Sequence, residues 1–143
     1  DFDGSYRFPQ DIKYGIKSFM VWANERSTGQ LFPYIPSFHL GQQLSWRPTL
    51  SNGFSGKISL NHLFVARQTH FDSAIDIDDA PPAYGVWGAE IELSKTLKNG
   101  QSLRLILTGD NLLNAEYKEY TNRARYYAHE AGRDIRASLL WKF

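Results

Sequence analysis

Apolar and polar residues alternate along most of this chain. In the stretch 134–143 one set of alternate positions is apolar and the other is mainly polar. The first set is Ile135, Ala137, Leu139, Trp141 and Phe143, and the second is Asp134, Arg136, Ser138, Leu140 and Lys142. A helix would repeat its apolar residues every three or four positions. The pattern therefore predicts a β-strand with one apolar and one polar face.

Similar alternation predicts strands at about 12–24, 36–47, 55–68, 87–94 and 102–108, and residues 2–8 fit the end of one more. His62 falls on the apolar face of its strand and interrupts it. We expect six or so antiparallel strands of roughly 11–14 residues, which is long for a soluble β-sandwich.

The connections between these strands are of two kinds, and the two kinds alternate. Short turns are expected at 9–11, 50–53 and 97–100, and the Asn-Gly pairs of the last two supply the positive φ angles of tight hairpins. Long polar loops are expected at about 25–34, 68–83 and 115–132. Tight turns at one end and long loops at the other are typical of a membrane β-barrel.

Tryptophan positions test the same interpretation. Trp46 and Trp141 fall near strand ends beside short turns, Trp22 and Trp87 fall near the long loops, and all four lie on the apolar face. An amphipathic ring is favoured at the membrane–water boundary, so these residues predict two membrane girdles. A soluble β-sandwich or a lipocalin-like barrel also has alternating strands and stays open as an alternative.

Composition removes several other classes. The 143 residues carry a net charge of +1 and contain no cysteine, which excludes a disulfide scaffold and cysteine-rich zinc sites. No apolar run could form a transmembrane helix, and a mean hydropathy of −0.44 is compatible with a membrane barrel because its two faces average out. We see no catalytic constellation and no organised basic patch, and so expect neither an enzyme, a cofactor nor nucleic-acid binding.

Four motifs together resemble the C-terminal part of TonB-dependent outer-membrane receptors. Residues 109–117 read GDNLLNAEY, Gly132-Arg133 precedes the strand ending in Phe143, residues 31–36 read LFPYIP, and 82–84 read PAY. Their order and spacing match the family over residues 31–143.

The resemblance implies an all-β fold, the C-terminal six or so strands of an antiparallel transmembrane β-barrel of roughly 22 strands. It implies that the chain lies in the outer membrane of a Gram-negative bacterium and serves TonB-dependent uptake of a scarce nutrient, with an iron-siderophore or other metal chelate favoured. The plug that contacts TonB, and the earlier strands, would lie outside this sequence. The alternative is a small self-contained outer-membrane barrel, either a structural anchor or a lipid-modifying enzyme.

The terminal strand carries the first candidate site. Leu139, Trp141 and Phe143 resemble the signal read by the outer-membrane barrel assembly machinery, since an unpaired strand edge can be templated by another sheet. The alternative is that Phe143 is simply a lipid-facing girdle aromatic.

The two later long loops carry the candidate ligand-binding residues: His70, Asp72, Tyr120, Arg123, Arg125, Tyr126, Tyr127 and His129. Arginine donors and flat tyrosine rings suit an anionic chelate. We favour two alternatives: a solvated acidic loop at 68–83 without a metal, and an Arg/Tyr cluster that anchors its loop to other loops or to lipopolysaccharide. On the inner face we expect charges to pair across strands, from His39, Glu90, Glu92, Arg104 and Arg136.

Overall fold

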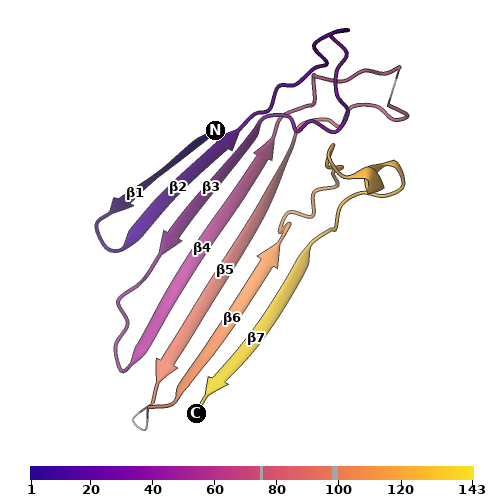
Figure 1. The fold of residues 1–143 in the computed structure, drawn as a ribbon. Helices are drawn as coiled ribbons and strands as arrows, with labels where there is room; N and C mark the ends of the chain where they lie inside the picture. Colours follow the sequence, from indigo (N-terminus) through magenta and orange to yellow (C-terminus); the bar gives the residue numbers. More distant parts are fainter. Residues whose placement is uncertain (75, 98–99) are drawn as a thin grey trace.

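The alternating stretches pair as neighbouring antiparallel strands of one sheet in the computed structural model, which describes residues 1–74, 76–97 and 100–143. In this part of the chain the sheet has seven strands, in spatial order identical to their order in sequence (Figure 1). They are β1 (Phe2–Phe8), β2 (Ile12–Phe19), β3 (His39–Trp46), β4 (Phe54–Val65), β5 (Tyr84–Thr96), β6 (Ser102–Asp110) and β7 (Asp134–Lys142), with one 3-10 helix, η1 (Arg123–Tyr126), between β6 and β7. The predicted all-β antiparallel class is confirmed.

Strand lengths correct the prediction. Only β4 and β5, with 12 and 13 residues, reach the expected length. Strand β2 ends at Phe19 rather than near residue 24, because Phe19 pairs with His39, the first residue of β3. Beyond that pair the backbone has no ladder partner, so Trp22 lies in a loop and not on a strand.

The register places the two sets of side chains on opposite faces, as predicted. Ile58 pairs with Ile91, Ile91 pairs with Leu107 and Leu107 pairs with Ala137. The next row along the strands joins Ser59, Glu90, Thr108 and Arg136. One face of the sheet is therefore mainly apolar and the other mainly polar across four neighbouring strands.

Nothing in the described part of the chain packs on the apolar face. Leu60 is 40% exposed, Ile91 46% and Leu139 67%, and the buried hydrophobic residues are Val65 and Tyr120 alone. A folded soluble domain would bury such a face against a second layer. Among residues 1–74, 76–97 and 100–143, no second layer covers the sheet.

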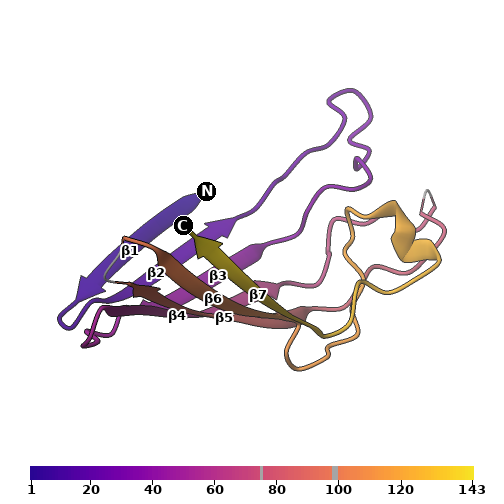
Figure 2. The same cartoon turned by 90° about the horizontal axis from the view of Figure 1, so that it is seen from below.

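The sheet curls into a trough whose two edge strands, β1 and β7, rise on the same side (Figure 2). The two edges are not paired with each other, so the sheet is open. Long connections lie together at one end of the strands and short ones at the other (Figure 1). No helix in the described residues is long and apolar enough to cross a membrane.

Tight turns at the short-loop end use the predicted backbone geometry. Asn52 and Gly53 have φ angles of 58° and 77°, and Gln10 and Asp11 have φ angles of 65° and 57°. Gly53 is also held close to the next hairpin, because its carbonyl accepts a hydrogen bond from the Thr96 amide at 3.0 Å. Asn99, half of the other predicted Asn-Gly pair, lies outside the described residues.

Candidate functional site: the inner trough and its loop cap

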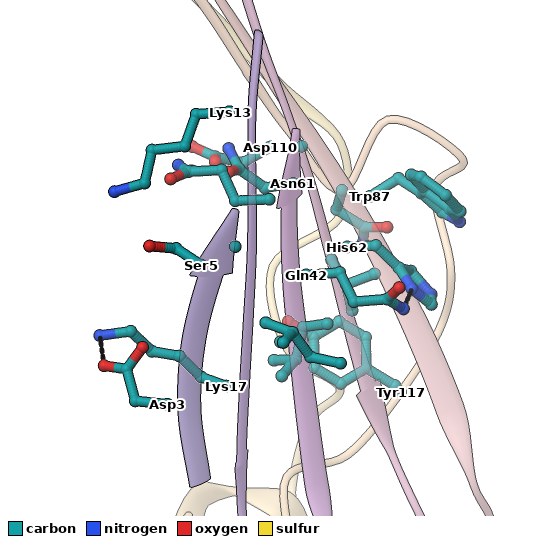
Figure 3. A pocket seen from close by; sticks show the side chains of 18 of the residues that line it. Asp3, Ser5, Lys13, Lys17, Gln42, Asn61, His62, Trp87, Asp110 and Tyr117 are labelled. Carbon is teal, nitrogen blue, oxygen red and sulfur yellow. Dashed lines mark hydrogen bonds and ion pairs between the residues drawn. The ribbon is translucent and has the colours of Figure 1, made fainter. Parts of the chain in front are cut away.

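A cavity of about 890 Å³ occupies the trough on the polar face of the sheet. Its lining comes from β1 to β5, from the end of β6 and from the start of β7. Figure 3 shows Lys13, Asp110 and Asn61 on one side of the strands and His62 and Trp87 on the other. Alternation requires this arrangement, because Asn61 and His62 are consecutive residues of β4. The trough therefore presents polar and charged side chains.

Most of these charges are paired across neighbouring strands. Asp3 lies 3.1 Å from Lys17, Glu90 2.9 Å from Lys57 and Glu92 3.2 Å from the Nε of Arg104. Arg136 binds both Asp110 and Asp134. The expected cross-strand pairing is confirmed for Glu92 with Arg104, and the other inner charges find different partners.

The base of the 111–133 connection is built by two asparagines of the GDNLLNAEY motif. The Asn111 side chain donates to the carbonyls of Ala115 at 2.9 Å and Ala131 at 3.1 Å, and accepts from the Ala115 amide at 2.8 Å. Asn114 accepts from the Arg133 amide at 3.0 Å. Both asparagines have positive φ, 47° and 53°, which this residue tolerates better than most. The motif thus holds the two ends of the connection together at the mouth of the trough.

Aromatic stacking joins this connection to the top of the sheet. Tyr117, which lines the cavity, stacks on Tyr84 at 4.4 Å between ring centroids. The Tyr84 hydroxyl donates to Glu119, whose carboxylate lies 3.8 Å from the Nε2 of buried His39. Burial, and then the nearby glutamates, raise the pKa of Tyr117. The connection is therefore fixed to the first residues of β5 and β3.

Arg125 forms the centre of a buried polar cluster among the long loops. Its side chain has no exposed surface and its guanidinium binds the carboxylate of Asp76, of which 3% is exposed. The same guanidinium lies over the rings of Tyr120 at 4.8 Å and Tyr126 at 4.4 Å, and donates to the Asp79 carbonyl at 3.3 Å. Its Nε atom has no hydrogen-bond partner.

Tyr126 completes the coordination of Asp76. Its hydroxyl donates to the second oxygen of Asp76 at 2.7 Å and lies 3.2 Å from the Tyr34 hydroxyl. Burial, followed by the hydrogen bonds with Tyr34 and Asp76, raises the pKa of Tyr126, while nearby Arg125 lowers it by less. A phenol that keeps its proton stays a donor to the carboxylate.

Contacts at the edge of this cluster bring all three long loops into one unit, called here the loop cap (residues 20–38, 66–83 and 111–133, as far as they are described). Lys118 binds Asp78 at 3.1 Å, and that hydrogen bond lowers the pKa of the Asp78 carboxyl. Arg123 lies over Tyr34, 5.0 Å from the ring centroid. Each loop thus contributes charged or aromatic groups to the others.

The structure separates the candidate ligand-binding residues into two groups. Tyr120 and Arg125 are buried inside the loop cap, with Tyr126 beside them. Their contacts are to the other loops, as in the alternative in which an Arg/Tyr cluster anchors its own loop. Tyr127 is 90% exposed, and His129 and Arg123 are also exposed.

The side chains of His70 and Asp72 make no hydrogen bond to Arg125, although the Asp72 carbonyl accepts one from the Asp76 amide at 3.1 Å. The His70 ring packs against Trp22, and Asp72 accepts from the Ala74 amide at 2.9 Å. No group of three or more His, Asp or Glu in the described residues could hold a metal ion.

Sequence reasoning did not single out Asp76 and Tyr34, which hold the Arg125 cluster together, nor Tyr84 and Glu119, which tie the same connection to the top of the sheet. The available signal was the presence of an acidic loop, with four aspartates within residues 72–79, and of a second loop that carries Arg123 and Arg125. A buried guanidinium needs a carboxylate partner, so one of these arginines could have been paired with one of these aspartates.

Among the membrane-girdle candidates, Trp46, Trp87 and Trp141 lie on the apolar face of β3, β5 and β7, at the strand ends expected for them. Trp22 is 63% exposed in the long connection between β2 and β3. Leu139, Trp141 and Phe143, the assembly-signal candidates, are 67%, 65% and 95% exposed along the free edge strand β7.

Comparison with known proteins found no match. No family model fits the chain, and neither the curated proteins nor the solved structures contain a significant relative. The resemblance to TonB-dependent receptors therefore stays a prediction.

Proposed function

We propose that this chain is the C-terminal part of a TonB-dependent outer-membrane receptor barrel, which takes up a scarce nutrient, with an iron-siderophore or other metal chelate favoured. One observation carries the proposal. A single curled sheet presents an uncovered apolar face outward and a charge-paired polar face inward, with long, packed loops at one end only.

Exposure of the apolar face supports a lipid surrounding. Rows of leucine and isoleucine from β3 to β7 stand about 40% exposed or more, with tryptophan near both ends of the strands. Soluble proteins rarely leave a continuous apolar surface of this kind uncovered. Hydrocarbon contact makes the same surface favourable, and the polar trough then lies inside the barrel.

The open edges support a wider barrel than these strands can make. Strands β1 and β7 each leave one row of backbone groups without a ladder partner. Such groups are costly in lipid, so a membrane sheet closes on itself. An all-antiparallel closed barrel needs an even number of strands, and the sheet described here has seven.

Ligand capture is assigned to the exposed surface of the loop cap. Arg123, Tyr127 and His129 are exposed there, and the residues beneath them hold the loops in place. A guanidinium and a flat phenol suit an anionic chelate. TonB would act through the plug, the assembly machinery through β7, and outer-membrane lipid and lipopolysaccharide through the outer face.

Intact mass measurement tests the proposal. The native polypeptide, extracted from the outer-membrane fraction of its source, is expected to be a detergent-soluble species far heavier than the 16.4 kDa of this chain. Deleting its gene should abolish TonB-dependent uptake of radiolabelled ferric citrate or a ferric hydroxamate under iron limitation. A water-soluble monomer would overturn the membrane assignment, and an outer-membrane species near 16.4 kDa would favour the small self-contained barrel.

A further inference from the structure

The outer face carries a hydrogen-bonded row of polar side chains among its apolar residues. The Tyr14 hydroxyl donates to Gln42 Oε1 at 2.7 Å, and Gln42 Nε2 lies 3.3 Å from His62 Nδ1. The His62 ring stacks on Trp87 with 4.2 Å between centroids and 24° between planes. The row crosses four neighbouring strands, β2 to β5, and all four side chains are partly exposed.

Hydrogen-bond chemistry fixes the direction of this row. The phenol donates to the amide oxygen, which leaves the amide nitrogen pointing at the imidazole (Figure 3). An amide nitrogen only donates, so His62 Nδ1 accepts and the ring proton of neutral His62 is on Nε2. The second contact thus selects one tautomer and makes Nε2–H a donor.

This donor has no hydrogen-bond partner among the described residues. Gly85 lies beside this nitrogen, and a Cβ at position 85 would come within 3.1 Å of His62 Nε2. Around the row stand apolar side chains such as Leu44 and Leu60, both at least 40% exposed. An N–H that is kept from water without an acceptor is destabilising. A ligand that brings an acceptor oxygen would remove this destabilisation.

Depth in the membrane identifies the source of the acceptor, and this step rests on the proposed function. His62 pairs directly with Trp87, which lies close to the long-loop end of β5. Tryptophan at such a position marks the level of the lipid head groups. A phosphate oxygen is the strongest acceptor found at that level, and its charge strengthens a hydrogen bond from Nε2–H. None of the described strand residues on this face carries a side-chain carboxylate that would repel it.

We infer that the His62–Trp87 pair is a binding site for the phosphate head group of a membrane lipid. Nε2–H of His62 donates to the phosphate, Trp87 covers one side of the ring, and Tyr14 and Gln42 are positioning residues that hold the tautomer. The surrounding leucines contact the upper part of the acyl chains.

Lipid retention by the protein extracted from its membrane in mild detergent tests this site. The probes are phosphatidylethanolamine, lipid A and diacylglycerol, titrated separately and counted by native mass spectrometry. His62→Leu should weaken retention of the two phosphate lipids roughly tenfold, the effect of one charge-assisted hydrogen bond. The control Ser55→Leu, at an exposed position on the trough face of β4, should leave retention unchanged.

A second variant keeps every polar group in place. Gly85→Ala crowds the ring at Nε2 and should also weaken retention. Histidine nitrogen shifts from a ¹⁵N-labelled sample should show His62 protonated on Nε2, and Tyr14→Phe should mix the tautomers.

Unchanged lipid retention in His62→Leu would overturn the inference and leave the proposed function intact. The same would follow if diacylglycerol, which has no phosphate, were retained as well as the two phosphate lipids. A water-soluble protein would overturn both. If the wild-type protein were a dimer with no lipid bound, this surface would be assigned to a second copy of the chain, and the lipid site would also be overturned.

Discussion

Replacing Arg125 with methionine should release the loop cap while leaving the sheet folded. Methionine keeps much of the length and apolar volume of the side chain but removes the charge that binds buried Asp76. The Asp76 carboxylate is then left with the Tyr126 hydroxyl and no positive partner in contact. Removing one member of a buried ion pair typically costs about 3–5 kcal/mol, because the remaining charge is uncompensated.

Amide hydrogen exchange in detergent micelles is the suitable assay, since it reports the loop cap and the strands separately. The informative amides are those bonded inside the cap, including Arg125 to Asn122 at 3.1 Å and Glu130 to Tyr117 at 2.9 Å. A loss of about 3 kcal/mol in local stability should accelerate their exchange more than roughly a hundredfold. Exchange in β4 and β5 should not change.

Two comparisons make the test discriminating. Arg123→Met removes an exposed guanidinium over Tyr34, and should cost no more than about 1 kcal/mol. Arg125→Met combined with Asp76→Leu should be more stable than Arg125→Met alone, because no charge is left buried. If Arg125→Met exchanged no faster than Arg123→Met, the buried ion pair would not be what holds the loops.

Three further outcomes are expected. Leu105→Arg on the outer face should cost about 2–4 kcal/mol on folding into lipid vesicles, whereas Ile106→Arg, which faces the trough opposite Glu92, should cost far less; equal costs would contradict the assignment of the faces. Gly53→Ala forces a side chain into φ +77° and within 3.0 Å of a carbonyl, so it should destabilise the hairpin by about 1 kcal/mol or more in urea unfolding. The raised pKa of Tyr126 means that its contribution to stability is present below pH of about 10 and lost as pH rises, since the unfolded tyrosine ionises first; loop-cap stability should therefore fall less steeply with alkaline pH in Tyr126→Phe.

The faces of the sheet could be predicted from sequence because a period of two determines them without any knowledge of partners. Ile58 and Ile91 alternate with polar neighbours within their own strands, and the register follows once apolar faces coincide. The end of β2 could not be predicted in this way. Met20 and Trp22 continue the alternation, but pairing stops where β3 begins, and a single strand carries no signal of its neighbour's length.

The loop cap was less predictable because its contacts join residues far apart in sequence. Arg125 and Asp76 belong to different loops, and only tertiary structure shows that they pair. Composition did indicate that an Arg/Tyr-rich loop could anchor to other loops. It could not indicate which arginine is buried, since Arg123 and Arg125 stand in similar sequence and differ because one points into the cap and one outward.

Sheet and loop cap are stabilised by different interactions, and this has a consequence for function. The sheet depends on its backbone ladders and, in the proposed setting, on lipid, whereas the cap depends on an internal ion pair and on stacked rings. Few hydrogen bonds connect the two, among them the Leu112 amide to the Trp87 carbonyl at 2.8 Å and Tyr84 to Glu119. Because Arg125 and Asp76 bind different loops to one point, loosening that point should open all three loops together. Under the proposed receptor function, the exposed surface of the loop cap would then rearrange as one unit without disturbing the strands beneath it.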